Sequence, residues 1–182
     1  MKKKSLLALL LAGVLALALT ACGGSGGDTA SEEAPDYLGK YNLLMIKMGP
    51  LVMTPDEYGY ENCYMELKDG GTLTFFDGKD SEEEPYTVDG TAFSMEENGS
   101  TMKGTIQDGT VTLTLTASDL GGEGDAEAMT MFFALEGSDA VSKLQDEATA
   151  AGTMDEQLEN MSQDDLLQFM EDYGYLFDSE SE

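Results

Sequence analysis

The stretch "DGTVTLTLT", residues 108–116, alternates threonine with aliphatic residues at a period of two. Val111, Leu113 and Leu115 fall on one face, and the threonines fall on the other. This alternation is typical of a β-strand that buries one face and exposes the other. The Asp-Gly pair in front of it favours a two-residue hairpin, because both central positions of a type I′ turn need positive φ. The stretch therefore predicts one strand of an antiparallel sheet.

The same pattern extends outward over residues 37–136. Asp-Gly or Asn-Gly pairs occur at residues 69–70, 77–78, 89–90, 98–99 and 108–109, which is a spacing of 8, 12, 9 and 10 residues. Turn signals at this spacing indicate an all-β meander, sandwich or barrel. Gly104, inside one strand, predicts a bulge or a close approach of two backbones. We expect about eight short strands, whose one-sided apolar residues are Leu44, Ile46, Met48, Leu73, Phe75, Phe93, Met95, Met102, Ile106, Met129, Met131, Phe133 and Leu135.

The opening strand "LGKYNLLMI" carries Gly39 and Tyr41. With the Asp-Gly hairpins and methionine-rich strands, this resembles the lipocalin-like domains of lipoproteins and secreted proteins from Gram-positive, especially clostridial, bacteria. The resemblance implies a small antiparallel barrel or sandwich, mainly β, over residues 37–136. It also implies that the long connection at residues 49–61 lies as a lid over one barrel mouth.

Two interpretations of the apolar residues stay open. They either line an adaptable pocket, which suits the soft methionine side chain, or simply fill a solid core. Under the pocket interpretation, the candidate ligand-binding residues are Leu51, Val52, Met53, Tyr58, Tyr60, Met65, Phe93, Met102 and Met131, and Met45, Met48, Met95 and Met129 would join them.

The periodicity becomes helical after Gly137, which predicts an acidic helical tail over residues 137–182. Ser138 would cap a helix that presents Val141, Leu144 and Ala148 and ends near Gly152. Thr153 and Glu156 fit a capping box, and Ser162 with the following acids would start another helix. The last helix is expected to present a stripe of Leu166, Leu167, Met170 and Tyr173, which either docks on the barrel or contacts a partner.

The chain opens with Lys2, Lys3 and Lys4, followed by an apolar run that is shorter than the ~20 residues a spanning helix needs. This pattern is typical of a secretion signal. The run ends in "LTAC" with Cys22, which resembles the lipobox of bacterial lipoproteins; an ordinary secretory peptide is the alternative. The resemblance implies cleavage between Ala21 and Cys22 and a diacylglycerol on the Cys22 sulfur. Residues 1–21 are then a signal peptide, and residues 22–36 are a lipidated cysteine with a flexible linker.

Composition excludes several classes of function. The chain holds 36 acids, nine lysines and no arginine, histidine or tryptophan, for a net charge of −27. Nucleic-acid binding needs a basic patch that this composition does not supply. Without histidine, the zinc sites and catalytic triads that depend on it are ruled out. Lipidation of Cys22 would leave Cys63 without a disulfide partner, and we interpret Cys63 as a buried small apolar residue.

Acids also cluster in "DGKDSEEE", residues 77–84, and "SDLGGEGDAE", residues 118–127. We interpret both as solvated charge runs rather than metal sites, and we predict no cofactor. The expected protein is a non-enzymatic lipoprotein on the extracytoplasmic face of the cell membrane, held by its lipid. It would bind a small apolar or amphipathic ligand or, alternatively, use a solid core and the tail helix or a sheet edge to contact a protein partner.

Overall fold

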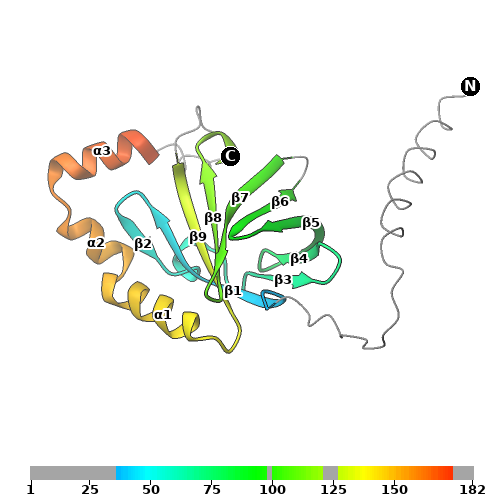
Figure 1. Ribbon diagram of the computed structural model, residues 1–182. Helices are drawn as coiled ribbons and strands as arrows, with labels where there is room; N and C mark the ends of the chain where they lie inside the picture. Colours follow the sequence, from blue (N-terminus) through cyan, green and yellow to red (C-terminus); the bar gives the residue numbers. More distant parts are fainter. Residues whose placement is uncertain (1–35, 98–99, 121–126, 174–182) are drawn as a thin grey trace, which may run out of the picture. The chain divides into compact units, whose positions relative to one another are not determined.

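The computed structural model describes residues 36–97, 100–120 and 127–173, which belong to one compact unit, Ala34–Glu182. The predicted signal peptide, Ala21, Cys22, nearly all of the linker and the turn at residues 98–99 lie outside the described residues. The described chain is mainly antiparallel sheet with three helices after it (Figure 1). Its strands are β1 (Gly39–Met48), β2 (Leu51–Met53), β3 (Tyr64–Lys68), β4 (Thr72–Phe76), β5 (Ser81–Asp89), β6 (Ala92–Glu97), β7 (Ser100–Gln107), β8 (Thr110–Thr116) and β9 (Glu127–Leu135).

Eight of the strands close into a barrel. Strands β3 to β9 pair each with the next, and β1 pairs with both β3 and β9, which joins the two ends of the sheet. The predicted lipocalin-like antiparallel barrel is confirmed. The hairpin between β7 and β8 has the predicted geometry, with φ of 51° at Asp108 and 72° at Gly109. Gly104 is confirmed as a close approach, because a Cβ there would overlap the carbonyl oxygen of Thr112.

The ninth strand, β2, lies in the connection that we expected to be an irregular lid. Gly49 and Pro50 make a tight turn, and β2 folds back on the C-terminal half of β1, with Met48 opposite Leu51 and Ile46 opposite Met53. Gly49 takes a φ of +55°, which glycine adopts without strain. A short 3₁₀ helix, η1 (Asp56–Tyr58), follows; a second one, η2 (Ser118–Leu120), follows β8. The turn chemistry of Gly-Pro therefore extends the sheet where we expected a loop.

The inward faces of the strands form one buried cluster, the interior core. Apolar side chains of every barrel strand contribute, as the period-two alternation predicts. Its members are Tyr41, Leu43, Ile46, Met48, Leu51, Met53, Cys63, Met65, Leu67, Leu73, Tyr86, Phe93, Met95, Met102, Ile106, Val111, Leu113, Met129, Met131, Phe133 and Phe169.

A β-bulge in β1 corrects one expected face. The register to β9 shifts between Leu43 and Met45, so one extra residue stands in β1 at this point. Ile46 and Met48 point into the interior core, but Leu44 and Met45 pack on the outside of the barrel. The prediction that Leu44 shares a face with Ile46 and Met48 was therefore wrong, and Met45 does not face the interior.

The helix α1 (Asp139–Ala151) covers that outer wall. Ala140, Leu144 and Ala148 lie on one helical face and pack with Met45 and Ala134 in a second cluster, the outer cluster. The helix predicted after Ser138 is present and ends before Gly152, but Ala140 is buried while Val141 is half-buried beside it. Ser138 occupies the N-cap position without a capping bond from its side chain, because its hydroxyl donates to the Leu135 carbonyl. Burial on both faces explains why β9 is almost continuously apolar.

The helices α2 (Met154–Asn160) and α3 (Gln163–Tyr173) complete the tail. The capping box is confirmed: the Thr153 hydroxyl accepts from the Glu156 N–H, and the Glu156 carboxylate accepts from the Thr153 N–H. The four residues expected as one stripe on α3 do not share one environment: Leu166 and Tyr173 are half-buried. Phe169 is the buried side chain and joins the interior core, while Leu167 and Met170 are exposed.

Candidate functional site

The residues predicted to bind a ligand lie mostly inside the barrel. Six of them belong to the interior core, and Tyr58 and Tyr60 are half-buried and pack against it. Val52 points outward and packs against the outer cluster. The six core residues are Leu51, Met53, Met65, Phe93, Met102 and Met131.

Large side chains crowd the space that a barrel ligand would need. Tyr41, Phe133, Met65 and Met95 are fully buried, and Phe169 joins them from α3 with 4% of its surface exposed. Eight strands enclose little more than the volume of their own inward side chains. Three cavities open on the surface of the described residues, and of the nine predicted ligand-binding residues Leu51 alone lines any of the three.

The first cavity lies beside β2, at the one strand edge that another described strand does not cover. We call it the edge groove. It has a volume of about 530 Å³ and opens to solvent between the β1–β2 turn and the corner of α1 and α2. Its lining residues are Pro50, Leu51, Thr149, Ala150, Ala151, Gly152, Glu156, Gln157, Asn160 and Met161.

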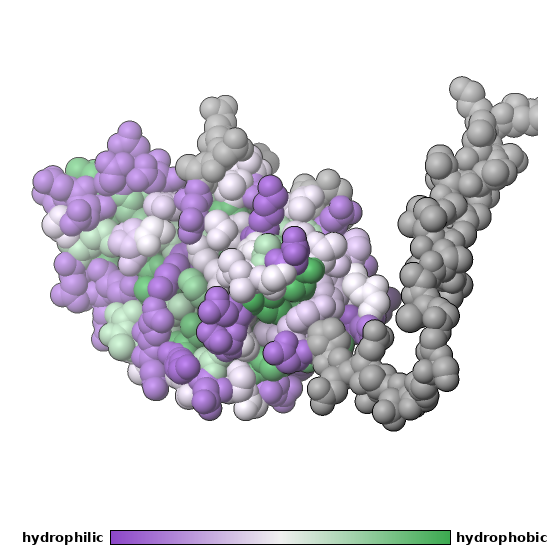
Figure 2. Space-filling view, in the orientation of Figure 1, coloured by the Kyte–Doolittle hydropathy of each residue, from purple (hydrophilic) through white to green (hydrophobic). Residues whose placement is uncertain are grey.

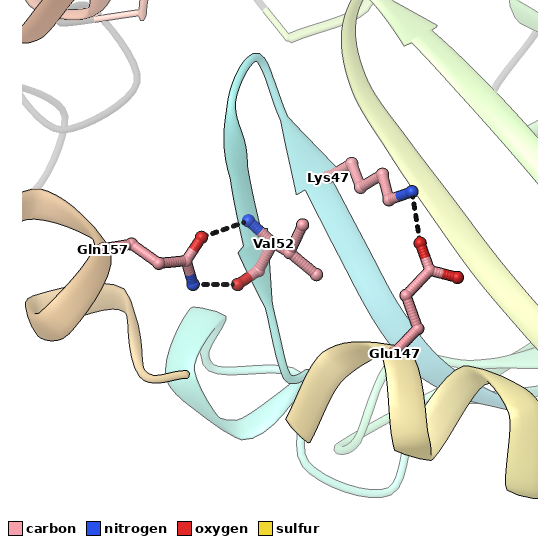
Figure 3. A network of polar contacts seen from close by, with 4 residues as sticks. All are labelled: Lys47, Val52, Glu147 and Gln157. Atoms are coloured by element: carbon pink, nitrogen blue, oxygen red, sulfur yellow. Dashed lines mark hydrogen bonds and ion pairs between the residues drawn. The ribbon is translucent and has the colours of Figure 1, made fainter. Parts of the chain in front are cut away.

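One side chain covers the middle of this strand edge. The Val52 N–H donates to Oε1 of Gln157 at 2.9 Å, and Nε2 of Gln157 donates to the Val52 carbonyl at 2.6 Å (Figure 3). In an antiparallel pair, successive residues point their peptide groups alternately towards the partner strand and away from it. The bonds to Gln157 show that the Val52 groups point away from β1. The primary amide of Gln157 thus takes the place of a peptide group in a neighbouring strand.

A second side chain, Glu57, fixes the end of the same edge. Its Oε2 accepts from the Thr54 N–H and the Thr54 hydroxyl, each at 2.8 Å, and its Oε1 accepts from the Met154 N–H at the first turn of α2. Burial acts to raise the pKa of the Glu57 carboxyl, but the N–H groups of Thr54 and Met154 and the Thr54 hydroxyl outweigh it and lower the pKa. Glu57 therefore ties β2 and η1 to α2 as an ionised group.

The other face of the β1–β2 hairpin contacts α1. Nζ of Lys47 lies 2.7 Å from Oε1 of Glu147 (Figure 3). The same Nζ lies 5.2 Å from the centre of the Phe132 ring. Lys47 and Phe132 border a second cavity of about 410 Å³ on the outside of the barrel wall, the wall groove. Its lining residues are Lys47, Gly49, Thr112, Thr114, Glu127, Ala128, Met129, Thr130, Phe132 and Tyr173.

A third cavity, of about 270 Å³, lies where β1 begins and the β7–β8 hairpin turns. Tyr37, Tyr41 and Ile106 are among its lining residues, and the Tyr41 hydroxyl donates to the Tyr37 carbonyl at 2.8 Å. Burial, with the nearby Asp36 and Tyr86, raises the pKa of Tyr41 to about 12. This phenol is a neutral structural donor at physiological pH.

No protein-family model, no curated protein and no solved structure matches this chain. The architecture is thus established by the strand pairings, and the function has to be inferred from surfaces and side chains. In the described part of the chain, no helix is long and apolar enough to cross a bilayer.

Some of the titratable side chains have structural partners that shift their pKa values. Backbone N–H groups of Asp80 and Lys79 lower the pKa of Asp77, and Lys68 lowers the pKa of Glu83 through a 2.7 Å ion pair. In the acidic runs at residues 77–84 and 118–127, as far as they are described, the side chains do not form a group of three ligands that could hold a metal ion. The chemistry that these surfaces offer is hydrogen bonding, ion pairing and apolar contact.

Sequence analysis did not identify Gln157 or Glu57. Each is a common polar residue at an unremarkable helical position, and its role depends on β2, which the sequence pattern did not predict. The adjacent capping box at Thr153 was predicted, and it could have located the start of α2, but it gives no sign of what the helix packs against.

Proposed function

We propose that this protein is a lipid-anchored, extracytoplasmic lipoprotein that acts as a non-enzymatic protein-interaction module. The N-terminal sequence supports the anchor: a basic head, a short apolar run and "LTAC" ending in Cys22. The barrel would be a solid platform, and the acidic tail would carry the contact surface. Its charge argues against nucleic acid as the partner.

One observation carries the choice of a partner over a ligand inside the barrel. Large side chains of the barrel strands and of Phe169 pack in the interior, while two large apolar side chains of α3 face solvent, Leu167 at 62% exposure and Met170 at 51%. They are three residues apart and so neighbours on the helix surface. Apolar residues of this size, held exposed on an ordered helix, mark an interaction surface.

The acidic surroundings define the partner further. Asp164, Asp165, Glu171 and Asp172 lie on the same helix, and Figure 2 shows hydrophilic residues over much of the helical side of the molecule. The partner would therefore present an apolar patch with a basic rim. Charge complementarity of this kind speeds association and excludes other acidic proteins.

Site-specific photo-cross-linking in native membranes tests the proposal. A benzophenone amino acid at position 167 should give a discrete protein adduct, and the same probe at position 87, an exposed polar position on β5, should give much less. No adduct at position 167, or equal adducts at both positions, would contradict the proposal. In the same cells, Cys22→Ser should move the protein from the membrane to the soluble fraction.

The wall groove favours a second candidate function, the binding of a small amphipathic molecule. Its volume lies within the usual range of ligand sites, ~300–1,000 Å³, and it combines the Phe132 ring with the Lys47 ammonium and threonine hydroxyls. A thermal-shift panel of fatty acids, sterols and bile-type amphiphiles tests it. A hit should be lost on Thr114→Trp, which fills the groove, and retained on Thr87→Trp on β5.

A further inference from the structure

The strand edge beside the edge groove differs from every other edge in the described sheet. Each barrel strand has two strand neighbours, but β2 has only β1. Open strand edges can pair with other chains, and proteins usually protect them. Here the helix α2 packs beside the edge, and two side chains, Gln157 and Glu57, take the hydrogen-bonding groups that a neighbouring strand would take.

The hydrogen bonds that Gln157 makes with this edge could be made instead by a bound peptide. An extended peptide laid against β2 would donate to the Val52 carbonyl and accept from the Val52 N–H, which are the two bonds that Gln157 makes. Replacing one neutral amide by another leaves the number of hydrogen bonds unchanged, and the remaining cost is the displacement of α2, which packs beside β2. The Thr54 N–H would offer a third bond if Glu57 released it.

The edge groove supplies the space that such a peptide needs. It opens directly beside Pro50 and Leu51, and its volume of about 530 Å³ exceeds that of the other two cavities. Met161 and Leu51 give it an apolar side, and Glu156 gives it a charged one. None of its described lining residues is basic.

Charge decides among the occupants. A second copy of this chain would bring one net charge of −27 against another. The chain's own segments outside the described residues on either side, 22–35 and 174–182, contain acids and no lysine, so they would be repelled as well. The acids of α2 at Asp155, Glu156 and Glu159 instead favour a cationic segment.

We propose that the outer edge of β2 is a strand-addition site for an extended cationic peptide segment of a partner protein, with the Gln157 amide as its exchangeable cover. The proposal shares with the proposed function the idea of a protein partner, but it concerns a different surface from Leu167 and Met170. The two can therefore fail separately.

A synthetic seven-residue peptide of alternating lysine and valine is the probe, and fluorescence anisotropy with the full-length protein in mild detergent is the measurement. Because any cation is attracted to so acidic a protein, the control peptide keeps the four lysines and has its central valine replaced by proline. Proline removes one backbone donor and disfavours strand pairing. The alternating peptide should bind at least about fivefold more tightly than the control, the effect of about one hydrogen bond.

Variants locate the site. Gln157→Ala removes the competing amide and should tighten binding of the alternating peptide about fivefold, whereas Gln163→Ala, the same change on α3, should leave it unchanged. On the wild-type protein, the ¹⁵N amide signal of Val52 should shift on binding. Leu167→Ser with Met170→Ser, which removes the apolar side chains without changing the charge, should not alter the affinity, and a loss there would move the peptide to the α3 surface.

Three results would overturn the proposal: equal binding of the two peptides, no binding of the alternating peptide, or an unmoved Val52 amide signal at saturation. The comparison of peptides and the Val52 signal use the wild-type protein, so both remain decisive if Gln157→Ala fails to fold. Failure of these tests would leave the cross-linking test at position 167 unaffected.

Discussion

Cys63 shows how the barrel interior controls a reactive group. The residue directly precedes β3, belongs to the interior core and is 2% exposed. Burial, with a further contribution from Asp77, raises the pKa of its thiol to about 12. The interpretation of Cys63 as a buried apolar residue agrees with this placement, and the thiolate that would be needed for nucleophilic chemistry does not form at neutral pH.

The raised pKa of Cys63 predicts a loss of stability in alkali. Above its ordinary pKa of 9.0 the thiol ionises in the unfolded chain, while the folded protein keeps the proton until about pH 12. The free energy of unfolding should therefore be unaffected by this group below pH 9 and fall between pH 9 and 12, by up to about 1.4 kcal/mol per pH unit. Urea unfolding at pH 8 and pH 10.5 measures this.

The matched variant for this measurement is Cys63→Ala. It should lose less stability than the wild-type protein between the two pH values. Tyr41, whose pKa is also raised to about 12, should account for part of the decline that remains. Equal losses in the variant and the wild-type protein would contradict the assignment to Cys63.

Glu57 joins two elements, because its carboxylate accepts hydrogen bonds from Thr54 after β2 and from Met154 of α2. Glu57→Gln keeps the size of the side chain but removes the charge that three donors stabilise. We expect a loss of about 1 kcal/mol at neutral pH, because bonds to a charged group are stronger but this carboxylate is partly exposed. Thermal unfolding measures it, with Glu159→Gln on α2 as the control that should leave the midpoint unchanged.

The pH dependence of the Glu57 effect has a definite sign. Its pKa is lowered in the folded protein, so its contribution to stability is present above the unfolded value of 4.5 and disappears as the pH falls through the lower folded value. The difference between wild type and Glu57→Gln should therefore shrink from pH 6 towards pH 3. If the difference in stability between the two proteins stayed constant from pH 6 to pH 3, the charge of the Glu57 carboxylate would not be its cause.

The elements also show what the sequence could and could not predict. Alternation and Asp-Gly turns identify the strands because backbone geometry and one-sided burial act locally. The bulge between Leu43 and Met45 could not be predicted, because it depends on the pairing with β9 and has no signature in the sequence of β1 itself. The strand β2 could not be predicted either, because three residues are too few to show a period-two alternation. The roles of Gln157 and Glu57 depend on β2, so they could not be predicted without it.

The same reasoning applies to α3. Its composition allows more than one apolar stripe, and Leu166, Leu167 and Met170 are as apolar as Phe169. Which of them is buried depends on how α3 crosses the barrel, which is a tertiary property. The ring of Phe169 is buried in the interior core, and Tyr173 packs against the same core. Leu167 and Met170 are therefore exposed to solvent.

For the whole molecule, the question is whether the acidic tail is part of the barrel's folding unit. Phe169 lies in the same cluster as residues of β1, β3 and β9, and it is about 120 positions from β1 in the sequence. Helix α1 covers the outer wall, and α2 holds the edge of β2. A tail attached at these three places should unfold with the barrel in one cooperative transition.

Phe169→Ala tests that coupling. Removing a buried aromatic ring typically costs ~3–5 kcal/mol, because the lost burial adds to the cavity left behind. If the tail and barrel are one unit, the variant should lower the denaturant midpoint of the barrel as much as that of α3. The barrel is followed through the amide ¹⁵N resonances of β4 and β7.

The control is Leu167→Ala, two residues earlier on the exposed face. It should change the free energy of unfolding of neither the barrel nor α3 by more than about 0.5 kcal/mol. A variant in which α3 melts alone while β4 and β7 keep their wild-type midpoint would show instead that the tail is a separately folding appendage.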